Sequence, residues 1–344
     1  MPAPIGRRRF LAGAAAMAAA SVAACSSRAR ALGAPAGVIT VANFPFYIDA
    51  TTNPGFTSAT GIDVEYHEEI VDEAVWLANG LQRVVSGQPL GRDVVVVSDW
   101  AAAQLARHGA VPATGNATWA QGMVGIAYDR RALGRDLTSA KELFQPDLHG
   151  RVVLPNDARH ALGIALLADD VDPSTATMDE IAATATHLAN SVQLGQLLPV
   201  DGAHPIDKLI AGDASAIVTS ASDTVGIEVL LPDVQFVVPL EGGLLLTDVA
   251  AVTNSAANAT GGHRYVDYAG EPAHAADRFR AVPAMWTIDG VTARLDAIAP
   301  AVVADPRRNP PLDVRARLRS FRILDDDEDA RLRDLFATAV TPGR

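Results

Sequence analysis

Acidic, histidine and tyrosine side chains occur in three groups that could support metal chemistry. His67-Glu68-Glu69 has no second histidine four residues on, so it does not form a zinc motif. The acidic run Asp325–Asp329 lacks the glycine of a calcium loop and is typical of a solvated helix start. Tyr265 and Tyr268 stand at helical spacing and are expected to pack rather than bind iron. Serine-nucleophile, phosphate-loop and paired-cysteine motifs are absent, so the sequence predicts neither an enzyme nor a metal or cofactor.

The single cysteine, Cys25, ends the first apolar segment of the chain. Arg7–Arg9 precede Phe10-Leu11 and a run of small apolar residues, which is the order of an export signal, and paired arginines there indicate the twin-arginine type. Small residues ending in cysteine resemble a bacterial lipobox, in which the thiol is lipidated. We therefore expect a signal peptide over 1–24, a tether over 25–37, and a lipid anchor at the outer face of the cytoplasmic membrane, in the cell envelope or periplasmic space. The alternative is a plain signal peptide with an incidental cysteine.

The charge balance of the chain is acidic. Lys and Arg number 28 against 40 Asp and Glu, for a formal net charge of −12, and the predicted signal removes Arg7–Arg9. Nucleic acid is not an expected partner, because neutralising phosphates requires clustered basic side chains. An acidic surface suits a cationic ligand, but it also suits ordinary solubility.

Short β-branched runs alternate with helical segments from residue 38 onward. Val38–Ala42 and Val94–Val97 are predicted to be buried strands, and Val71–Val85 and Met178–Asn190 are predicted to be helices. Further short strands are expected at 63–66, 124–128, 152–154, 216–219, 234–238 and 249–252. This alternation predicts an α/β protein with mostly parallel sheets, with ligands bound outside the carboxyl ends of the strands. Roughly 300 residues are enough for two lobes.

A collinear series of short motifs resembles the polyamine (spermidine/putrescine) substrate-binding proteins of ABC transporters. The motifs are Asn43–Asp49, Phe56–Val64, Arg92–Trp100, Gly122–Tyr128, Asn156–Arg159, Pro239–Gly243 and Phe321–Asp326. The resemblance spans essentially all of residues 38–340. It implies a two-lobed, type II periplasmic-binding-protein-like fold, in which each lobe is a mostly parallel sheet flanked by helices. Lobe one would be residues 38–124 plus 249–344, and lobe two residues 125–248.

The resemblance also implies which side chains bind the ligand. In the family, carboxylates hold ammonium groups and aromatic rings line the methylene stem, which suits the chemistry of a polyamine. The matching residues are Asp157 and Asp248 for charge, Ser98 for hydrogen bonding, and Phe44, Tyr47 and Trp100 for the walls, with Trp119 and Trp286 as further aromatic candidates. Two structural alternatives remain open: Asp157 could cap a helix, and Trp100 could be a core residue.

Several positions depart from the family pattern. Two tryptophans of the family fall at Ser220 and Leu246, and two of its acids fall at His160 and Phe46. A connecting segment of the family is missing near Pro112–Asn116. Each lost contact is worth on the order of 0.5–2 kcal/mol, so tight spermidine binding is not expected.

The predicted function is capture of a small cationic solute, a polyamine or a related compound, and its delivery to the permease of an ABC importer. The protein would act as a monomeric lipoprotein whose lobes close about crossovers near Val124 and Val249. The alternative is a non-transport surface lipoprotein that uses a degenerate cleft as an interaction scaffold. The lost aromatic positions favour this alternative, whereas the retained Asp157 and Asp248 oppose it. A hydrolase using His160 and Asp157 as acid and base ranks third.

Replacing Cys25 with alanine should release the protein from membranes and leave residues 38–344 folded, because the thiol would serve only for lipid attachment. Fractionation after a high-salt wash measures this release. A Cys25→Ala protein that still sediments with membranes would contradict the anchor. Arg7→Lys combined with Arg8→Lys should separately block twin-arginine export, and normal export of that variant would indicate the general secretory route instead.

Overall fold

The computed structural model describes residues 37–199 and 204–341. The predicted signal peptide, Cys25 and nearly all of the tether therefore lie outside the described residues. Within the described ranges, every helix is too short or too polar to cross a bilayer.

One end of the sheet is built from three parallel strands. β1 (Gly37–Asn43) pairs with β2 (Ile62–Glu68) on one side and with β3 (Val94–Ser98) on the other. The four valines of β3 are completely buried, as their continuous β-branched run predicted. The helices α2 (Thr52–Thr60), α3 (Glu73–Val85) and α4 (Asp99–Arg107) follow these strands in turn. The sequence-based strands and the helix over 71–85 are confirmed here.

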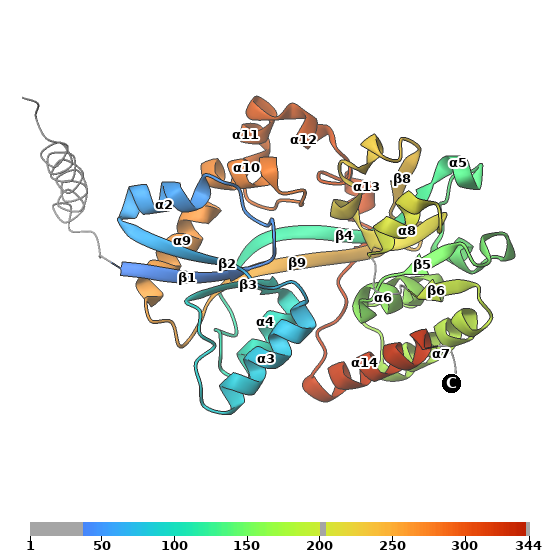
Figure 1. Ribbon diagram of the computed structural model, residues 1–344, viewed down its shortest axis with the longest axis horizontal. Coiled ribbons are helices and arrows are strands. Elements are labelled where there is room, and N and C mark those ends of the chain that lie inside the picture. Colours follow the sequence, from blue (N-terminus) through green and yellow to red (C-terminus); the bar gives the residue numbers. More distant parts are fainter. Residues whose placement is uncertain (1–36, 200–203, 342–344) are drawn as a thin grey trace, which may run out of the picture.

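Two long antiparallel strands, β4 (Ala117–Asp129) and β9 (Gly243–Val252), join the two halves of the molecule. β3 pairs with β9, and β7 (Ala216–Ser220) pairs with β4. The strand order is β2-β1-β3-β9-β4-β7-β5-β6, so one continuous sheet runs through both lobes (Figure 1). The α/β class and the two-lobed fold are confirmed. The sequence analysis expected a sheet in each lobe, whereas the two lobes share one sheet through the antiparallel pair β4 and β9. Local sequence patterns do not reveal which distant strands pair.

The second half of the sheet carries its own helices. β5 (Val152–Leu154) pairs in parallel with β6 (Leu197–Pro199) and with β7, while β8 (Val234–Val237) pairs with β4. The buried faces of α6 (Ala158–Ala168) and α7 (Met178–Gln193) cover this half. Shorter elements here are α5 (Arg130–Leu133), α8 (Pro205–Ala211) and the 3₁₀ turns at Ala140–Phe144, Pro146–Leu148, Ala221–Thr224 and Ile227–Val229.

The chain after β9 returns first to the end of the sheet that holds β1. There α9 (Ala259–Gly270), α10 (Pro272–Ala281) and α11 (Val291–Ile298) pack on the same core as β1 and β3. Tyr265 is fully buried against Phe56, as predicted for a packing residue. The short elements α12 (Pro300–Ala304), α13 (Leu312–Arg315) and β10 (Leu318–Arg319) follow.

The last helix, α14 (Asp326–Val340), lies alongside α7 (Figure 1). Its buried residues Leu332 and Phe336 belong to the core formed by α6, α7 and β5. The structure therefore differs from the expectation that all of 249–344 lies in lobe one, because the apolar face of this helix is buried in the other half. Below, lobe two means residues 125–248 together with α14.

The acidic run before α14 begins the helix as expected, but it is only partly solvated. Asp325 caps the helix by accepting a hydrogen bond from the backbone N–H of Glu328 at 2.8 Å. Asp329, by contrast, is buried and ion-paired with Arg159 and Arg333. The sequence expectation of a fully solvated charge run is thus wrong for Asp329.

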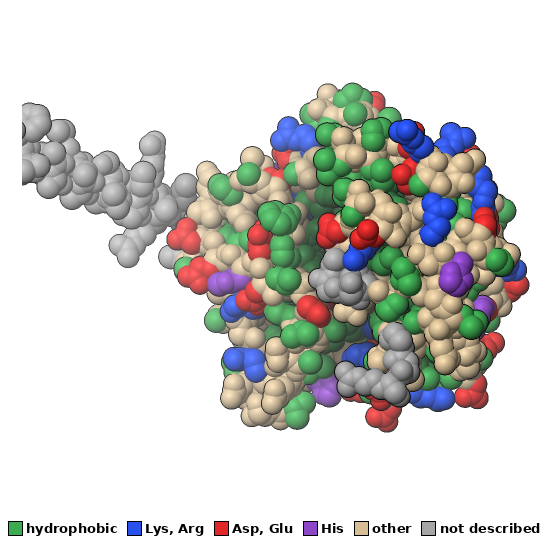
Figure 2. Space-filling model, turned by 45° about the vertical axis from the view of Figure 1, so that its right-hand side comes forward, with side chains coloured by type: hydrophobic (Ala, Val, Ile, Leu, Met, Phe, Trp, Pro, Cys, Tyr) green, Lys and Arg blue, Asp and Glu red, His purple; other side chains and the backbone are tan. Residues whose placement is uncertain are grey.

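Charged side chains are mixed on the face of the molecule shown in Figure 2. Basic groups lie singly or in small sets between acidic and hydrophobic side chains, without one continuous basic patch on this face.

Truncating Leu332 to alanine should lower the free energy of unfolding by about 2–5 kcal/mol, because its side chain is fully buried in the lobe-two core. Arg331→Ala, on the exposed side of the same helix, is the matched control and should change stability by less than about 0.5 kcal/mol. Urea unfolding of both variants measures the difference. Equal stability of the two would show that α14 is not part of that core.

Candidate functional site

The site centres on Asp248, which the sheet places where the two lobes meet. In β9, Asp248 lies opposite Ser98, the last residue of β3, and opposite Ala120 of β4. The hydroxyl of Tyr47 donates a hydrogen bond to its Oδ2 at 2.6 Å. Burial raises the pKa of the Asp248 carboxyl to about 6, although the bond from Tyr47 favours the ionised form. Asp248 is therefore a carboxylate that is costly to ionise in the empty site.

The loop after β1 supplies the aromatic side of the site. The rings of Phe44 and Tyr47 pack edge to face, with centroids 5.6 Å apart. Phe46, which replaces a family glutamate, has a left-handed backbone with φ of 58° and an 85% exposed side chain. Of the three rings in this loop, Tyr47 is the one that reaches Asp248.

Glu73, in the first turn of α3, is a further candidate site residue, which the sequence analysis did not single out. Its two carboxylate oxygens accept hydrogen bonds from the backbone N–H and the hydroxyl of Ser98, each at 2.7 Å. Burial raises the pKa of Glu73 to about 8. The bonds from Ser98 oppose this shift, and the charges of Asp248 and Asp157 add to it. Acids are so common in the first turn of a helix that this position carries no sequence signal of a binding role.

The ring of Trp100, in the first turn of α4, stacks against an arginine of the other lobe. The guanidinium carbon of Arg159 lies 3.9 Å from the centroid of the Trp100 ring. Arg159 belongs to α6 and is ion-paired with the buried Asp329. Trp100 is partly buried and also packs on the core beneath α4, so its ring is both a core contact and a stacking surface.

Asp157 caps a helix, which is the structural alternative that the sequence analysis left open for it. It caps α6, accepting a hydrogen bond from the backbone N–H of His160 at 2.8 Å, and it is exposed. Its charge nevertheless contributes to the raised pKa of Glu73, so it belongs to the electrostatic surroundings of the site.

Trp119 and Trp286 are core residues rather than walls of the site. Trp119 is buried under the guanidinium of Arg278, which lies 3.9 Å from its ring centroid and donates to its backbone carbonyl at 3.0 Å. Trp286 is buried beside Phe279 and donates through Nε1 to Thr292 Oγ1 at 2.8 Å. Burial of these two large rings stabilises the core of lobe one.

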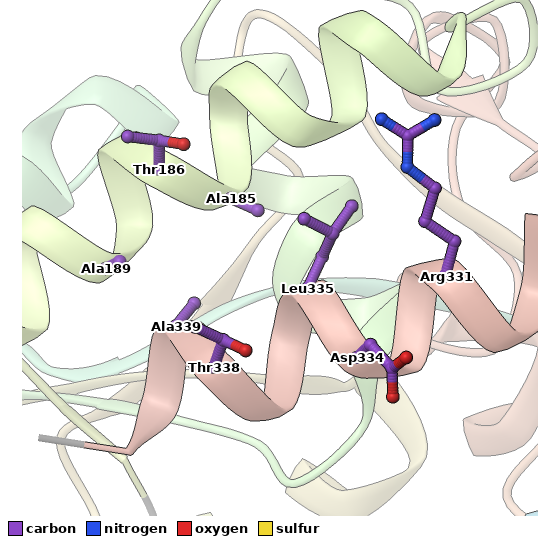
Figure 3. A pocket seen from close by; sticks show the side chains of 8 residues that line it. All are labelled: Ala185, Thr186, Ala189, Arg331, Asp334, Leu335, Thr338 and Ala339. Atoms are coloured by element: carbon purple, nitrogen blue, oxygen red, sulfur yellow. The ribbon is translucent and has the colours of Figure 1, made fainter. Parts of the chain in front are cut away.

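Two hollows were compared with the positions of the predicted site residues. A hollow of about 260 Å³ between α7 and α14 is lined mainly by small side chains and contains none of the predicted site residues (Figure 3). A smaller hollow of about 150 Å³ borders the site. Its lining residues are Asp99, Ala102, Ala103, Ala113, Asn116 and Val249. Asp99 and Val249 follow Ser98 and Asp248 in the chain, and burial raises the pKa of Asp99. Within residues 37–199 and 204–341, no group of His, Cys, Asp or Glu side chains is arranged to hold a metal.

Neutralising Glu73 should change how stability depends on pH. Because the pKa of Glu73 is raised from 4.5 to about 8 in the folded protein, the folded state holds this proton more tightly than the unfolded chain. This contribution to stability is complete below pH 4.5 and is lost as pH rises through about 8. Wild type should therefore lose stability relative to Glu73→Gln over this range, as measured by urea unfolding at each pH. A difference between them that does not vary with pH would contradict the raised pKa.

Comparison with known proteins identifies the class of the chain. Residues 75–308 match the family described as bacterial extracellular solute-binding protein. The spermidine/putrescine-binding periplasmic protein 1 of Haemophilus influenzae is 28% identical over 149 residues, which cover 43% of this chain and 41% of that protein. The chain thus matches about two fifths of the length of this curated relative.

Solved structures share the fold. The spermidine/putrescine ABC transporter substrate-binding protein PotD of Streptococcus pneumoniae superposes with a TM-score of 0.73 at 16% identity, covering 88% of this chain and 98% of that one. The TpPotD lipoprotein of Treponema pallidum gives a TM-score of 0.71 at 16% identity, covering 88% and 99%. With the family match extending over most of its length, the chain belongs to the bacterial extracellular solute-binding proteins, which bind solutes rather than transform them.

Proposed function

We propose that this protein captures a small cationic solute between its lobes and delivers it to the permease of an ABC importer. The observation that carries the proposal is the pair of carboxylates, Asp248 and Glu73, gathered around Ser98 at the junction of the lobes. Among the described residues, neither acid forms an ion pair with a lysine or arginine. The pKa of each is raised, mainly by burial.

A bound ammonium group would supply the missing positive charge. Partly buried carboxylates without a cation are costly to ionise, and a cation repays this cost through charge-assisted hydrogen bonds. An ammonium has three N–H donors. The carboxylate oxygens of Asp248 and Glu73 are acceptors for them, and the hydroxyls of Tyr47 and Ser98 lie beside these acids. The ring of Tyr47 stands next to Asp248 and could cover an apolar stem.

A polyamine or a related amine is the proposed ligand class. Support comes from the relatives, two of which are named for spermidine and putrescine. Ser220 and Leu246 stand where the family has tryptophans, so fewer rings are available to a long methylene stem. A short amine fits the remaining groups better than spermidine does. Delivery to a permease, lipid anchoring at Cys25 and a monomeric state belong to the same proposal.

An interaction scaffold is the second candidate function, and one contact favours it. Arg159 stacks on Trp100, so a ring expected to face the ligand is covered by a cation of the protein itself. The hollow beside the site measures only about 150 Å³. A protein with a degenerate cleft would bind no small cation at all.

Replacing Asp248 with asparagine should weaken binding of a cationic ligand by about 1.5–3 kcal/mol, the usual value of a hydrogen bond to a charged group. This is roughly ten- to a hundredfold in Kd. Glu73→Gln should act in the same direction, and Trp100→Ala should weaken binding through loss of a ring wall. Asp334→Asn, an exposed acid on α14, is the control and should bind like wild type.

Calorimetry with putrescine, spermidine and an uncharged sugar distinguishes the candidates. The proposal requires an amine to bind wild type best. Unchanged amine binding by Asp248→Asn, or tighter binding of the sugar, would contradict a cationic ligand. If neither amine bound wild type, the scaffold function would be favoured.

A further inference from the structure

The acidic start of α14 makes contacts that the proposed function does not use. Asp326 Oδ1 accepts hydrogen bonds from Arg107 Nη2 at 2.8 Å and from Arg107 Nε at 3.1 Å. Its Oδ2 lies 2.8 Å from His108 Nε2. Arg107 Nη2 also donates to the backbone carbonyl of Leu324 at 3.0 Å. One aspartate of lobe two thus binds two consecutive basic residues at the end of α4, in lobe one.

The N-terminal end of α4 is also linked to α14, through Arg159. Trp100 lies under the guanidinium of Arg159, and Arg159 is ion-paired with Asp329, one turn further along α14 than Asp326. The side chain of Asp329 is only 1% exposed and that of Arg159 only 11%, so this contact is shielded from solvent. Arg333 pairs with Asp329 as well.

These contacts join parts of the protein that have separate cores. The buried residues of α4 pack with β3 and α3, whereas those of α14 pack with α6 and α7. α4 has nine residues and is therefore about 13 Å long. Side chains from lobe two contact both ends of α4. Asp326 contacts Arg107 and His108 at the C-terminal end, and Arg159, which is paired with Asp329, contacts Trp100 at the N-terminal end. Figure 1 shows α14 between α7 and the side of the molecule that holds α3 and α4.

We propose that α14 is a closing latch between the lobes. When the lobes separate about β4 and β9, Asp326 loses Arg107 and His108, and Arg159 leaves the ring of Trp100. Arg159 is then a positioning residue, since it links Trp100, a predicted wall of the ligand site, to Asp329 of α14. The latch is a property of the empty protein, so it is tested without a ligand and stands independently of the nature of the solute.

The strength expected of the Asp326 contact is modest. Its side chain is 47% exposed, and exposed ion pairs change equilibria by only a few-fold. Loss of this contact should raise the ratio of open to closed protein about two- to fivefold. Asp329 is less suitable as a test, because its removal would leave the buried Arg159 without a counter-charge and could unfold the protein.

Spin-label distances across the lobes test the latch in the exported chain carrying Cys25→Ala. Labels attached through Gln82→Cys on α3 and Asn190→Cys on α7 occupy exposed positions in lobe one and lobe two. Pulsed electron resonance of the ligand-free protein should show a two- to fivefold rise in the longer-distance population for Asp326→Asn. Arg107→Gln, which removes the charge from the other side of the contact, should give the same rise.

Asp327→Asn is the matched control. Asp327 lies in the same first turn, is exposed, and forms no ion pair within residues 37–199 and 204–341. It should leave the wild-type distances unchanged. Distance distributions that coincide for Asp326→Asn, Arg107→Gln and Asp327→Asn would overturn the latch.

Discussion

The partly buried carboxylate of Asp248 is the constraint around which the site is arranged. β9 carries it to the place where the sheet passes from one lobe to the other, opposite the last residue of β3 and Ala120 of β4. Tyr47 is its hydrogen-bond donor, and Glu73 lies close enough that their charges oppose each other. Two acids that resist ionisation together form a site whose electrostatic energy improves when a cation enters.

The proposed latch would link this site to the proposed movement of the lobes. α4 begins at Ser98 and Trp100, beside the acids, and ends at Arg107 and His108, which contact α14. A solute bound at the start of α4 and a contact at its end act on one short rigid element. Contacts made to both lobes at once favour the closed arrangement over the open one.

Local sequence patterns predicted most of the strands and the helices at 71–85 and 178–190, but not the long-range partners of these elements. The valine run of β3 and the apolar spacing of α3 are local signals, and the strand and helix that they predict are confirmed. The placement of α14 on lobe two depends on packing against residues far away in the chain, which periodicity does not encode. Trp119 and Trp286 illustrate the same limit, because their burial in the lobe-one core depends on residues far away in the chain, such as Arg278 beside Trp119. The motif comparison made Asp248 and Tyr47 candidates for the site, whereas Glu73 becomes a candidate only once the fold places it beside Ser98.

The central claim, that a cation enters a site of reluctantly ionised acids, is tested most directly by proton release on binding. With a pKa of about 8, Glu73 is largely protonated at pH 7, and a bound ammonium must displace that proton. Putrescine binding measured by calorimetry at pH 7, in two buffers with different ionisation enthalpies, should give different heats that correspond to release of up to about one proton. Equal heats in the two buffers, with putrescine bound, would contradict the account.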